Sequence, residues 1–318
     1  MTTPIAPLDF SGVIPPEFST QIIEEAVQQS AVLRLANTVP MGTSISEMPV
    51  PKTLPKASWV SAPGGRKAYT ALGLETETLH AEEIAAVTAI PDQYLEDASI
   101  NLWGWVRPRL AEAIAIALDD AVLFGTGAPA TFPAGGINAV AINVATGTDA
   151  LDSVNQAMSA VEAQGLAVNG SAADLVVKGA LRGVRDANGA LLIGDTQING
   201  QTVQTLYGVP ITYTQFGTMP PDYFTGDWNA CIIGVRQDIR YAMDPSAVIA
   251  DDAGKVVISG FQDNTTPLKV WARFACAIIS PVTQRTPAGA KAFAKTQVTG
   301  TAPAPGNGAL SASAKSSK

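Results

Sequence analysis

The chain has little of what most catalytic and metal sites are built from. Its 318 residues include one histidine and two cysteines. The histidine, His80, has no nucleophile or carboxylate partner that the sequence identifies, so we interpret it as an ordinary strand residue. Cys231 and Cys276 lack metal-ligand spacing and are expected to be small buried residues in a reducing compartment. The sequence therefore predicts no enzyme, no metal and no cofactor.

Long hydrophobic runs and dense charge are also missing. The most apolar run, residues 110–124, is interrupted by Glu112, Asp119 and Asp120, so it is too short and too charged to span a bilayer. The first residues lack the basic region and apolar core of a signal peptide. Charged residues make up only 15% of the chain and hydrophobic residues 47%. This balance predicts a soluble intracellular protein that buries part of its surface in an assembly.

The sign of the charge argues against nucleic-acid recognition. The net charge is −8, and residues 286–318 contain four lysines and no acid, so the preceding body carries −8 − 4 = −12. Such a body repels phosphates unless positive charge is concentrated locally. The strongest basic cluster is Arg66–Lys67, which is small. We therefore expect no direct recognition of DNA.

Residues 92–124 are predicted to form one long helix. Apolar residues recur every four positions from Leu102 to Val122, which places them in one slowly drifting stripe. Pro108 is expected to kink this helix or to mark a junction between two helices. Gly125 is expected to end it, and the segment GTGAPA that follows is interpreted as a helix stop and turn, not as a dinucleotide-binding loop.

Residues 46–90 are predicted to be the two extended arms of a long hairpin-like excursion. The first arm contains four prolines, the second alternates apolar and polar residues, and Gly64–Gly65 forms a flexible tip. A two-stranded ribbon is only marginally stable alone in water. The excursion is therefore expected to lie on another surface, with Trp59 as its anchor.

The remaining chain alternates between helix and strand patterns. A helix is expected over 148–165, a short buried strand over 174–177 and a short helix over 179–186. Residues 209–214 alternate like a half-buried strand, with Gly208 and Pro210 at its start, where a strand tolerates proline. Residues 286–318 have the low-complexity composition of a tail. Four adjacent acid pairs are expected to be solvated: Glu24–Glu25, Glu82–Glu83, Asp119–Asp120 and Asp251–Asp252.

The order of several segments resembles the major capsid proteins of tailed bacteriophages. These segments run from PPEFSTQIIEEAVQQSAVLRLAN and ASWVSAPGGRKAYT, through AIPDQYLEDASINLWGWVRPRLAEAIAIALDDAVLFGTG and LRGVRDANGALL, to LYGVPITYTQ, GDWNACIIGVRQDIRY and FQDNTTPLKVWARFACAIISPVT. The match covers roughly residues 10–285. This family has the Hong Kong 97 fold, which encapsulin shells share. The order and spacing of the segments carry the resemblance.

The resemblance implies an α+β fold divided into named parts. They are an N-arm (1–45), an E-loop (46–90), a P-domain (91–141) with a spine helix (92–124), an A-domain (142–250), P-domain return strands (251–285) and a C-terminal tail (286–318). It implies assembly contacts at Trp59, Arg66 and Lys67 in the E-loop, Asn264, Trp271 and Arg273 in the P-domain, and Gly208 and Pro210 in the A-domain. The strand at 209–214 would pack around fivefold and sixfold axes.

The implied function is self-assembly into the icosahedral head shell of a tailed double-stranded DNA phage (Caudoviricetes). The implied partners are other copies in pentamers and hexamers, a portal protein, a separate scaffolding protein, a decoration protein, and packaged DNA held without sequence-specific contacts. No membrane is involved, and assembly is expected in the cytoplasm of the host bacterium. A self-scaffolding extension is not expected, because the chain starts almost directly at the arm.

Some members of the family join an E-loop lysine to a P-domain asparagine with the help of a glutamate. Lys67 and Asn264 are the counterparts here, but the position of the glutamate holds Trp271. Because no carboxylate would accept the proton, we expect no autocatalytic crosslinking.

Two other classes of function stay open at the level of sequence. An encapsulin-like compartment would use the same fold to enclose a cargo enzyme, and a cargo-binding groove would indicate it. A small soluble α/β enzyme would need a polar pocket, which one histidine does not supply. Gel filtration separates both shells from the enzyme by particle size.

Overall fold

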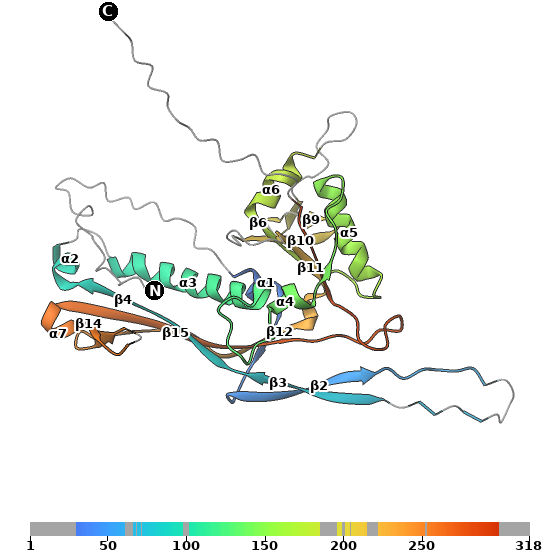
Figure 1. Ribbon diagram of the computed structural model, residues 1–318, viewed down its shortest axis with the longest axis horizontal. Helices are drawn as coiled ribbons and strands as arrows, with labels where there is room; N and C mark the ends of the chain where they lie inside the picture. Colours follow the sequence, from blue (N-terminus) through green and yellow to red (C-terminus); the bar gives the residue numbers. More distant parts are fainter. Residues whose placement is uncertain are drawn as a thin grey trace, which may run out of the picture.

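A long sheet, a second sheet and a projecting ribbon make up the described part of the protein (Figure 1). The computed structural model describes residues 30–60, 66–67, 69–70, 72–97, 102–184, 196–198, 201–203, 205–214, 222–251 and 253–298. Its helices and strands mix along the chain, as the α+β prediction requires.

The long sheet has the order β1-β12-β15-β4. Its strands are β1 (Asn37–Pro40), β12 (Cys231–Met243), β15 (Thr265–Ile278) and β4 (Glu82–Pro91). β1 pairs with β12 in parallel, and the other neighbours are antiparallel. Most of β15 and the first four residues of β12 are buried, and both strands contribute to a core with a helix.

That helix is α3 (Leu102–Phe124), which lies along the long sheet (Figure 1). The predicted apolar stripe is confirmed: Leu102, Ile114, Leu118 and Val122 are buried, the last three in the core shared with β12 and β15. The helix continues through Pro108, so the alternative of a junction between two helices at this proline is wrong. A short helix, α2 (Asp92–Asp97), precedes it, and residues 98–101 lie outside the described ranges.

Glycine ends α3 as predicted. Gly125 has φ +71° and its N–H donates to Ala121 O at 3.1 Å. The next helix, α4 (Gly136–Val140), begins against this end. A Cβ atom at Gly136 would lie 2.3 Å from Val122 O, so the two backbones approach closely only because this residue has no side chain.

The second sheet has the order β5-β16-β11-β6-β10-β9. Its strands are β5 (Ile142–Asn143), β16 (Phe293–Thr296), β11 (Tyr223–Gly226), β6 (Gly170–Asp174), β10 (Val209–Thr214) and β9 (Thr205–Leu206). Helices α5 (Ala150–Glu162) and α6 (Leu175–Arg182) pack their apolar residues on it and form a second core.

Two local predictions in this region are wrong. Residues 175–177 form the first turn of α6 and are not a strand, because the carboxylate of Asp174, the last residue of β6, accepts from Val176 N at 2.9 Å and caps the helix. The buried strand is β6, which precedes them. The predicted half-buried alternation of β10 is also wrong, since Thr212 and Thr214 are buried between neighbouring elements. The helix predicted over 179–186 is α6, which ends at Arg182; residues 185–186 lie outside the described ranges.

Three predicted domain boundaries differ from the limits of the observed sheets. Residues 82–91 form β4 of the long sheet, so the excursion ends near His80 and not at residue 90. The chain returns to the long sheet at Cys231 and not at residue 251. Residues 293–296 form the buried strand β16, so the tail cannot begin at 286; Lys295 Nζ donates to Asn138 O at 2.6 Å. Residues 299–318 lie outside the described ranges.

Smaller elements complete the fold. They are α1 (Ala31–Leu35), the ribbon strands β2 (Ile45–Thr53) and β3 (Gly73–His80), the pair β7 (Thr196–Ile198) and β8 (Gln201–Val203), the 3₁₀ turn at Trp228–Ala230, the hairpin β13 (Val248–Ala250) and β14 (Val256–Ser259), and α7 (Gly260–Asp263). Of the arm predicted over 1–45, residues 1–29 lie outside the described ranges, and β1 belongs to the long sheet.

Candidate assembly surfaces

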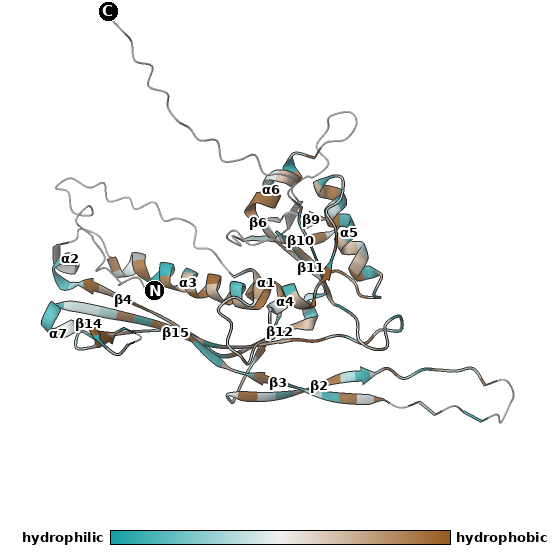
Figure 2. Cartoon of the chain, viewed as in Figure 1, coloured by the Kyte–Doolittle hydropathy of each residue, from teal (hydrophilic) through white to brown (hydrophobic). Residues whose placement is uncertain are grey.

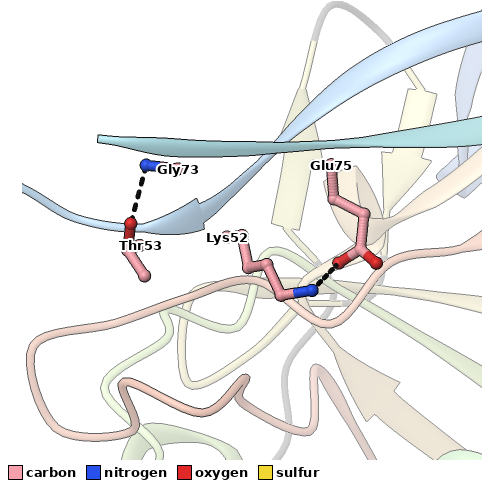
Figure 3. Close-up of polar contacts among 4 residues, drawn as sticks. All are labelled: Lys52, Thr53, Gly73 and Glu75. Atoms are coloured by element: carbon pink, nitrogen blue, oxygen red, sulfur yellow. Dashed lines mark hydrogen bonds and ion pairs between the residues drawn. The ribbon is translucent and has the colours of Figure 1, made fainter. Parts of the chain in front are cut away.

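The ribbon of β2 and β3 projects from the long sheet (Figure 1). Its pairing runs from Ile45 opposite His80 to Thr53 opposite Gly73. At the outer end, Gly73 N donates to Thr53 Oγ1 at 2.7 Å, and Lys52 Nζ lies 3.1 Å from a Glu75 carboxylate oxygen (Figure 3). This ion pair is well exposed, so it contributes little to stability.

Only the base of the ribbon packs on the rest of the chain. Leu79 and Ala81 are buried in a small cluster with Met41 and with Ala275 and Ala277 of β15. Further out, Leu72 and Leu74 are exposed although they are apolar. The ribbon therefore leaves the subunit with hydrophobic side chains that the described part of the chain does not cover.

The predicted E-loop contacts lie beyond the paired strands. Trp59 is fully exposed and Tyr69 is 91% exposed. Arg66 and Lys67 are exposed on the same segment. The structure thus gathers Trp59, Arg66 and Lys67 on one projecting segment, away from the core of their own chain. Gly64–Gly65 lies outside the described residues.

The predicted P-domain contacts do not lie together within one chain. Asn264 is exposed at the end of α7, with φ +47°, and its carbonyl accepts from Asp92 N at 2.8 Å. Trp271 follows seven residues later along β15, a rise of roughly 23 Å for an extended strand. Arg273 instead donates to Ala81 O at 3.3 Å and braces the base of the ribbon.

Asp263 and Asp92 bring two carboxylates near Asn264 that the sequence pattern does not indicate. Asp263 precedes it directly and accepts from Ser259 N at 2.8 Å. Asp92 accepts from the Thr266 hydroxyl at 2.6 Å. Within one chain, these carboxylates lie nearer to Asn264 than Trp271 does, although Trp271 holds the position of the family's glutamate. The expectation of no autocatalytic crosslinking stays a prediction.

The predicted A-domain contacts form a tight hairpin at the edge of the second sheet. Tyr207 and Gly208 both have positive φ, as a two-residue hairpin turn between β9 and β10 requires. Pro210 pairs with Thr205 of the edge strand β9 and precedes Ile211, where the pairing of β10 with β6 begins, so its missing N–H falls at the start of the strand. Tyr207 is exposed, so the turn presents an aromatic side chain to solvent.

An apolar patch at the far end of the long sheet was missed. It is a group of exposed apolar residues on β13, β14 and α7: Val248, Val256, Val257 and Phe261, with Val256 and Val257 on opposite faces of β14. Phe261 is 86% exposed, and Figure 2 shows the hydrophobic colouring of β14 at this end. The run KVVISGF carries the signal, because consecutive apolar residues in a short hairpin cannot all face a core.

Asp119 corrects the prediction of solvated acid pairs. It is buried, and its carboxylate accepts from Ser30 Oγ, Ala31 N at 2.8 Å and Val32 N at 3.2 Å. It therefore caps the start of α1 from the middle of α3. Burial raises the pKa of Asp119 from 3.8 to about 6, against the opposing effect of these hydrogen bonds.

A pocket of about 390 Å³ lies between the last turns of α3, β4 and the loop after Gly125. Among its lining residues, Leu118, Phe132 and Phe274 are buried and form an apolar floor, whereas Glu82 and Asp120 are half-buried and form its rim. It is called the acid-rimmed pocket below. Glu82 accepts from the Thr131 hydroxyl at 3.0 Å. No ion pair involves Glu82 or Asp120 among the described residues.

The residue types that most often form catalytic or metal sites do not cluster among the described residues. No group of three histidine, cysteine or acidic residues suited to a metal occurs among the described residues. Cys231 and Cys276 are buried on neighbouring strands, and a hydrogen bond between the thiols together with burial raises the pKa of Cys231. No helix in the described ranges has the length and hydrophobicity needed to cross a membrane.

The Phage capsid family profile matches residues 11–282. The chain belongs to the phage capsid family. It is 29% identical over 291 residues to a probable major capsid protein of Mycobacterium phage D29, covering 84% of this chain and 86% of that protein. It is 32% identical over 116 residues to the major capsid protein of Escherichia phage T5, covering 35% and 25% of the two chains.

Solved structures agree with this membership. A chain from Mycobacterium phage Adephagia superposes with a TM-score of 0.74 at 25% identity, covering 92% of this chain and 98% of the other. The capsid of a native GTA particle has the same fold, with a TM-score of 0.60 at 19% identity and coverage of 90% and 95%. The predicted α+β capsid fold and the role of a phage major capsid protein are therefore confirmed.

Proposed function

We propose that this chain builds the icosahedral head shell of a tailed double-stranded DNA phage by laying its ribbon on a neighbouring copy. The observation that carries the proposal is the ribbon itself. Two strands alone are marginal in water, yet this pair extends from the subunit with Trp59 fully exposed. A neighbouring copy would supply the missing contacts.

The parts of the capsid fold correspond to the two sheets and the ribbon. The long sheet with α3 is the proposed P-domain, and the second sheet with α5 and α6 is the proposed A-domain. The ribbon β2–β3 with its outer segment is the proposed E-loop. Because β16 lies in the second sheet, this A-domain includes residues 293–296 as well as the chain from 142 to 226.

The proposed partners follow from a closed shell. Copies would meet as pentamers and hexamers, with the Tyr207–Gly208 turn and Pro210 near the axes and the patch around Phe261 in contacts between capsomers. A portal protein at one vertex, a separate scaffolding protein and a decoration protein complete the proposal. The virion would be assembled in the host cytoplasm, and the acidic shell would confine packaged DNA without specific contacts.

Trp59→Ala tests the ribbon's role. Burying one aromatic side chain contributes about 2–3 kcal/mol, and in a symmetric shell this contribution recurs at every equivalent interface. We expect the variant to keep its circular dichroism spectrum but to sediment as unassembled subunits at concentrations where the wild type forms particles. Trp228→Ala is the matched control, because Trp228 is buried in the core and its loss should disturb folding.

Either of two results would contradict the proposal. One is unfolding of the isolated Trp59→Ala subunit, which would place Trp59 in its own core. The other is assembly at the wild-type concentration threshold, which would show that no neighbour uses this side chain.

A further inference from the structure

The segment between the ribbon strands has a charge opposite to the rest of the chain. Residues 54–72 contain Lys56, Arg66 and Lys67 and no acidic residue, a charge of +3. The remaining chain therefore carries −8 − 3 = −11. None of these three cations takes part in an ion pair among the described residues. This segment is called the basic tip below.

The acid-rimmed pocket has the complementary features. Its rim carries the carboxylates of Glu82 and Asp120, which lack a cation among the described residues, and its floor is apolar. Partial burial raises the pKa of Asp120, as expected for a carboxylate without a counter-charge. The neighbouring Glu83 differs, because Lys269 lies 3.4 Å from it.

The tip cannot reach the pocket of its own chain. Glu82 follows directly after the base of the ribbon, and the pairing of β2 with β3 then runs outward over eight residues. At a rise of about 3.3 Å per residue, the outer end lies roughly 25 Å from that base. The ribbon and β4, which lines the pocket, leave that base in opposite directions (Figure 1), so a tip that fills such a pocket comes from another copy.

We propose that the basic tip of one subunit docks in the acid-rimmed pocket of a neighbouring subunit. Arg66 and Lys67 pair there with Glu82 and Asp120, and Trp59 covers the apolar floor. The inference rests on the proposed function, because only an assembly brings the two surfaces together. It adds the receiving site, which would fix the register of the ribbon on its neighbour through charge as well as apolar contact.

A charge swap tests the pairing. Lys67→Glu and Glu82→Lys should each raise the concentration needed for assembly by about tenfold, because each places like charges together. The double variant restores opposite charges and the wild-type net charge, so its threshold should return close to that of the wild type. Lys291→Glu and Glu162→Lys are the controls, with the same changes of charge at exposed positions outside the proposed contacts.

Crosslinking tests proximity directly. In assembled particles of the Lys67→Cys/Glu82→Cys variant, a short bis-maleimide reagent should join copies into covalent multimers on a denaturing gel. Lys67→Cys/Glu162→Cys should give few of them, and the native Cys231 and Cys276 are buried. Circular dichroism of each unassembled variant establishes that it has folded.

The inference and the proposed function fail in different ways. Particles that form normally but show neither charge-swap rescue nor the Lys67–Glu82 crosslink would overturn the docking site and leave the shell intact. A wild-type protein that forms no particles under any assembly condition would overturn both.

Discussion

Replacing the buried Asp119 with asparagine should change how the stability of the subunit depends on pH. The side chain keeps its shape, but the variant loses the titrating carboxyl that caps α1. Burial raises the pKa of Asp119 from 3.8 to about 6, which means that the folded protein holds this proton more tightly than the unfolded chain. Stability from this group is therefore fully present below pH 3.8 and is lost as the pH rises through 6.

The size of the effect follows from the shift. About two pH units correspond to roughly 3 kcal/mol between the fully protonated and fully ionised states. At pH 5 the unfolded carboxyl is already mostly ionised, so about half of this loss has occurred, and roughly 1.5 kcal/mol remains between pH 5 and pH 8. The free energy of unfolding of the wild type, relative to Asp119→Asn, should fall by that amount over this range.

Urea unfolding of the unassembled subunit, followed by tryptophan fluorescence, measures this difference at each pH. Asp244→Asn is the control that should give a constant difference from pH 5 to pH 8, because hydrogen bonds from Ser246 lower the pKa of Asp244 from 3.8, and its stabilising contribution is lost only as the pH falls below that value. A difference between wild type and Asp119→Asn that is constant from pH 5 to pH 8 would refute the reasoning. It would show that the hydrogen bonds from Ser30, Ala31 and Val32 fully offset the burial of charge.

Three further predictions concern DNA, crosslinking and the turn after α3. The net charge of residues 1–298 is −8 − 2 = −10, so purified subunits should bind DNA at most weakly and in a salt-sensitive way; a submicromolar dissociation constant at physiological salt would contradict this. Mature particles should run as monomers on a denaturing, reducing gel. A ladder of covalent multimers that disappears with Lys67→Ala or Asn264→Ala would show that a carboxylate does accept the proton. Asp92→Asn and Asp263→Asn would then show which carboxylate it is. Gly136→Ala should lower the free energy of unfolding by several kcal/mol, because its Cβ would lie 2.3 Å from Val122 O. The control is Gly127→Ala, whose Cβ would meet nothing within 4 Å and which should lower that free energy by about 1–2 kcal/mol for its positive φ alone. Equal losses in urea unfolding would show that the contact near Val122 relaxes freely.

The elements that could be predicted are those whose pattern is local and strong. The stripe from Leu102 to Val122 identified α3 because its period matches a helix over six turns. By contrast, β6 consists of small residues with no hydrophobic signal, and β16 lies in a stretch whose alanines and lysines are typical of a tail. Their burial depends on pairing with strands far away in the sequence, which composition does not encode.

Among the candidate surfaces, too, those formed by one local segment could be predicted and those formed by distant segments could not. The exposure of Trp59 followed from a ribbon too thin to bury it, so local reasoning was sufficient. The pocket near Glu82 could not be found in this way, because α3, β4 and the loop at Phe132 contribute to it from separate parts of the chain. Asp119 was assigned to solvent because its acidic neighbour suggested a polar face, whereas α1 folds back onto it from 88 residues away.

The position of β16 has a consequence for the timing of synthesis. This strand, at residues 293–296, lies between β5 and β11, which are made much earlier. Until the ribosome has passed residue 296, the nascent second sheet is split, and β5 and β11 each present an unpaired edge. The sheet can close only after residues 293–296 have been made, so a growing chain that stops before them has an incomplete second sheet.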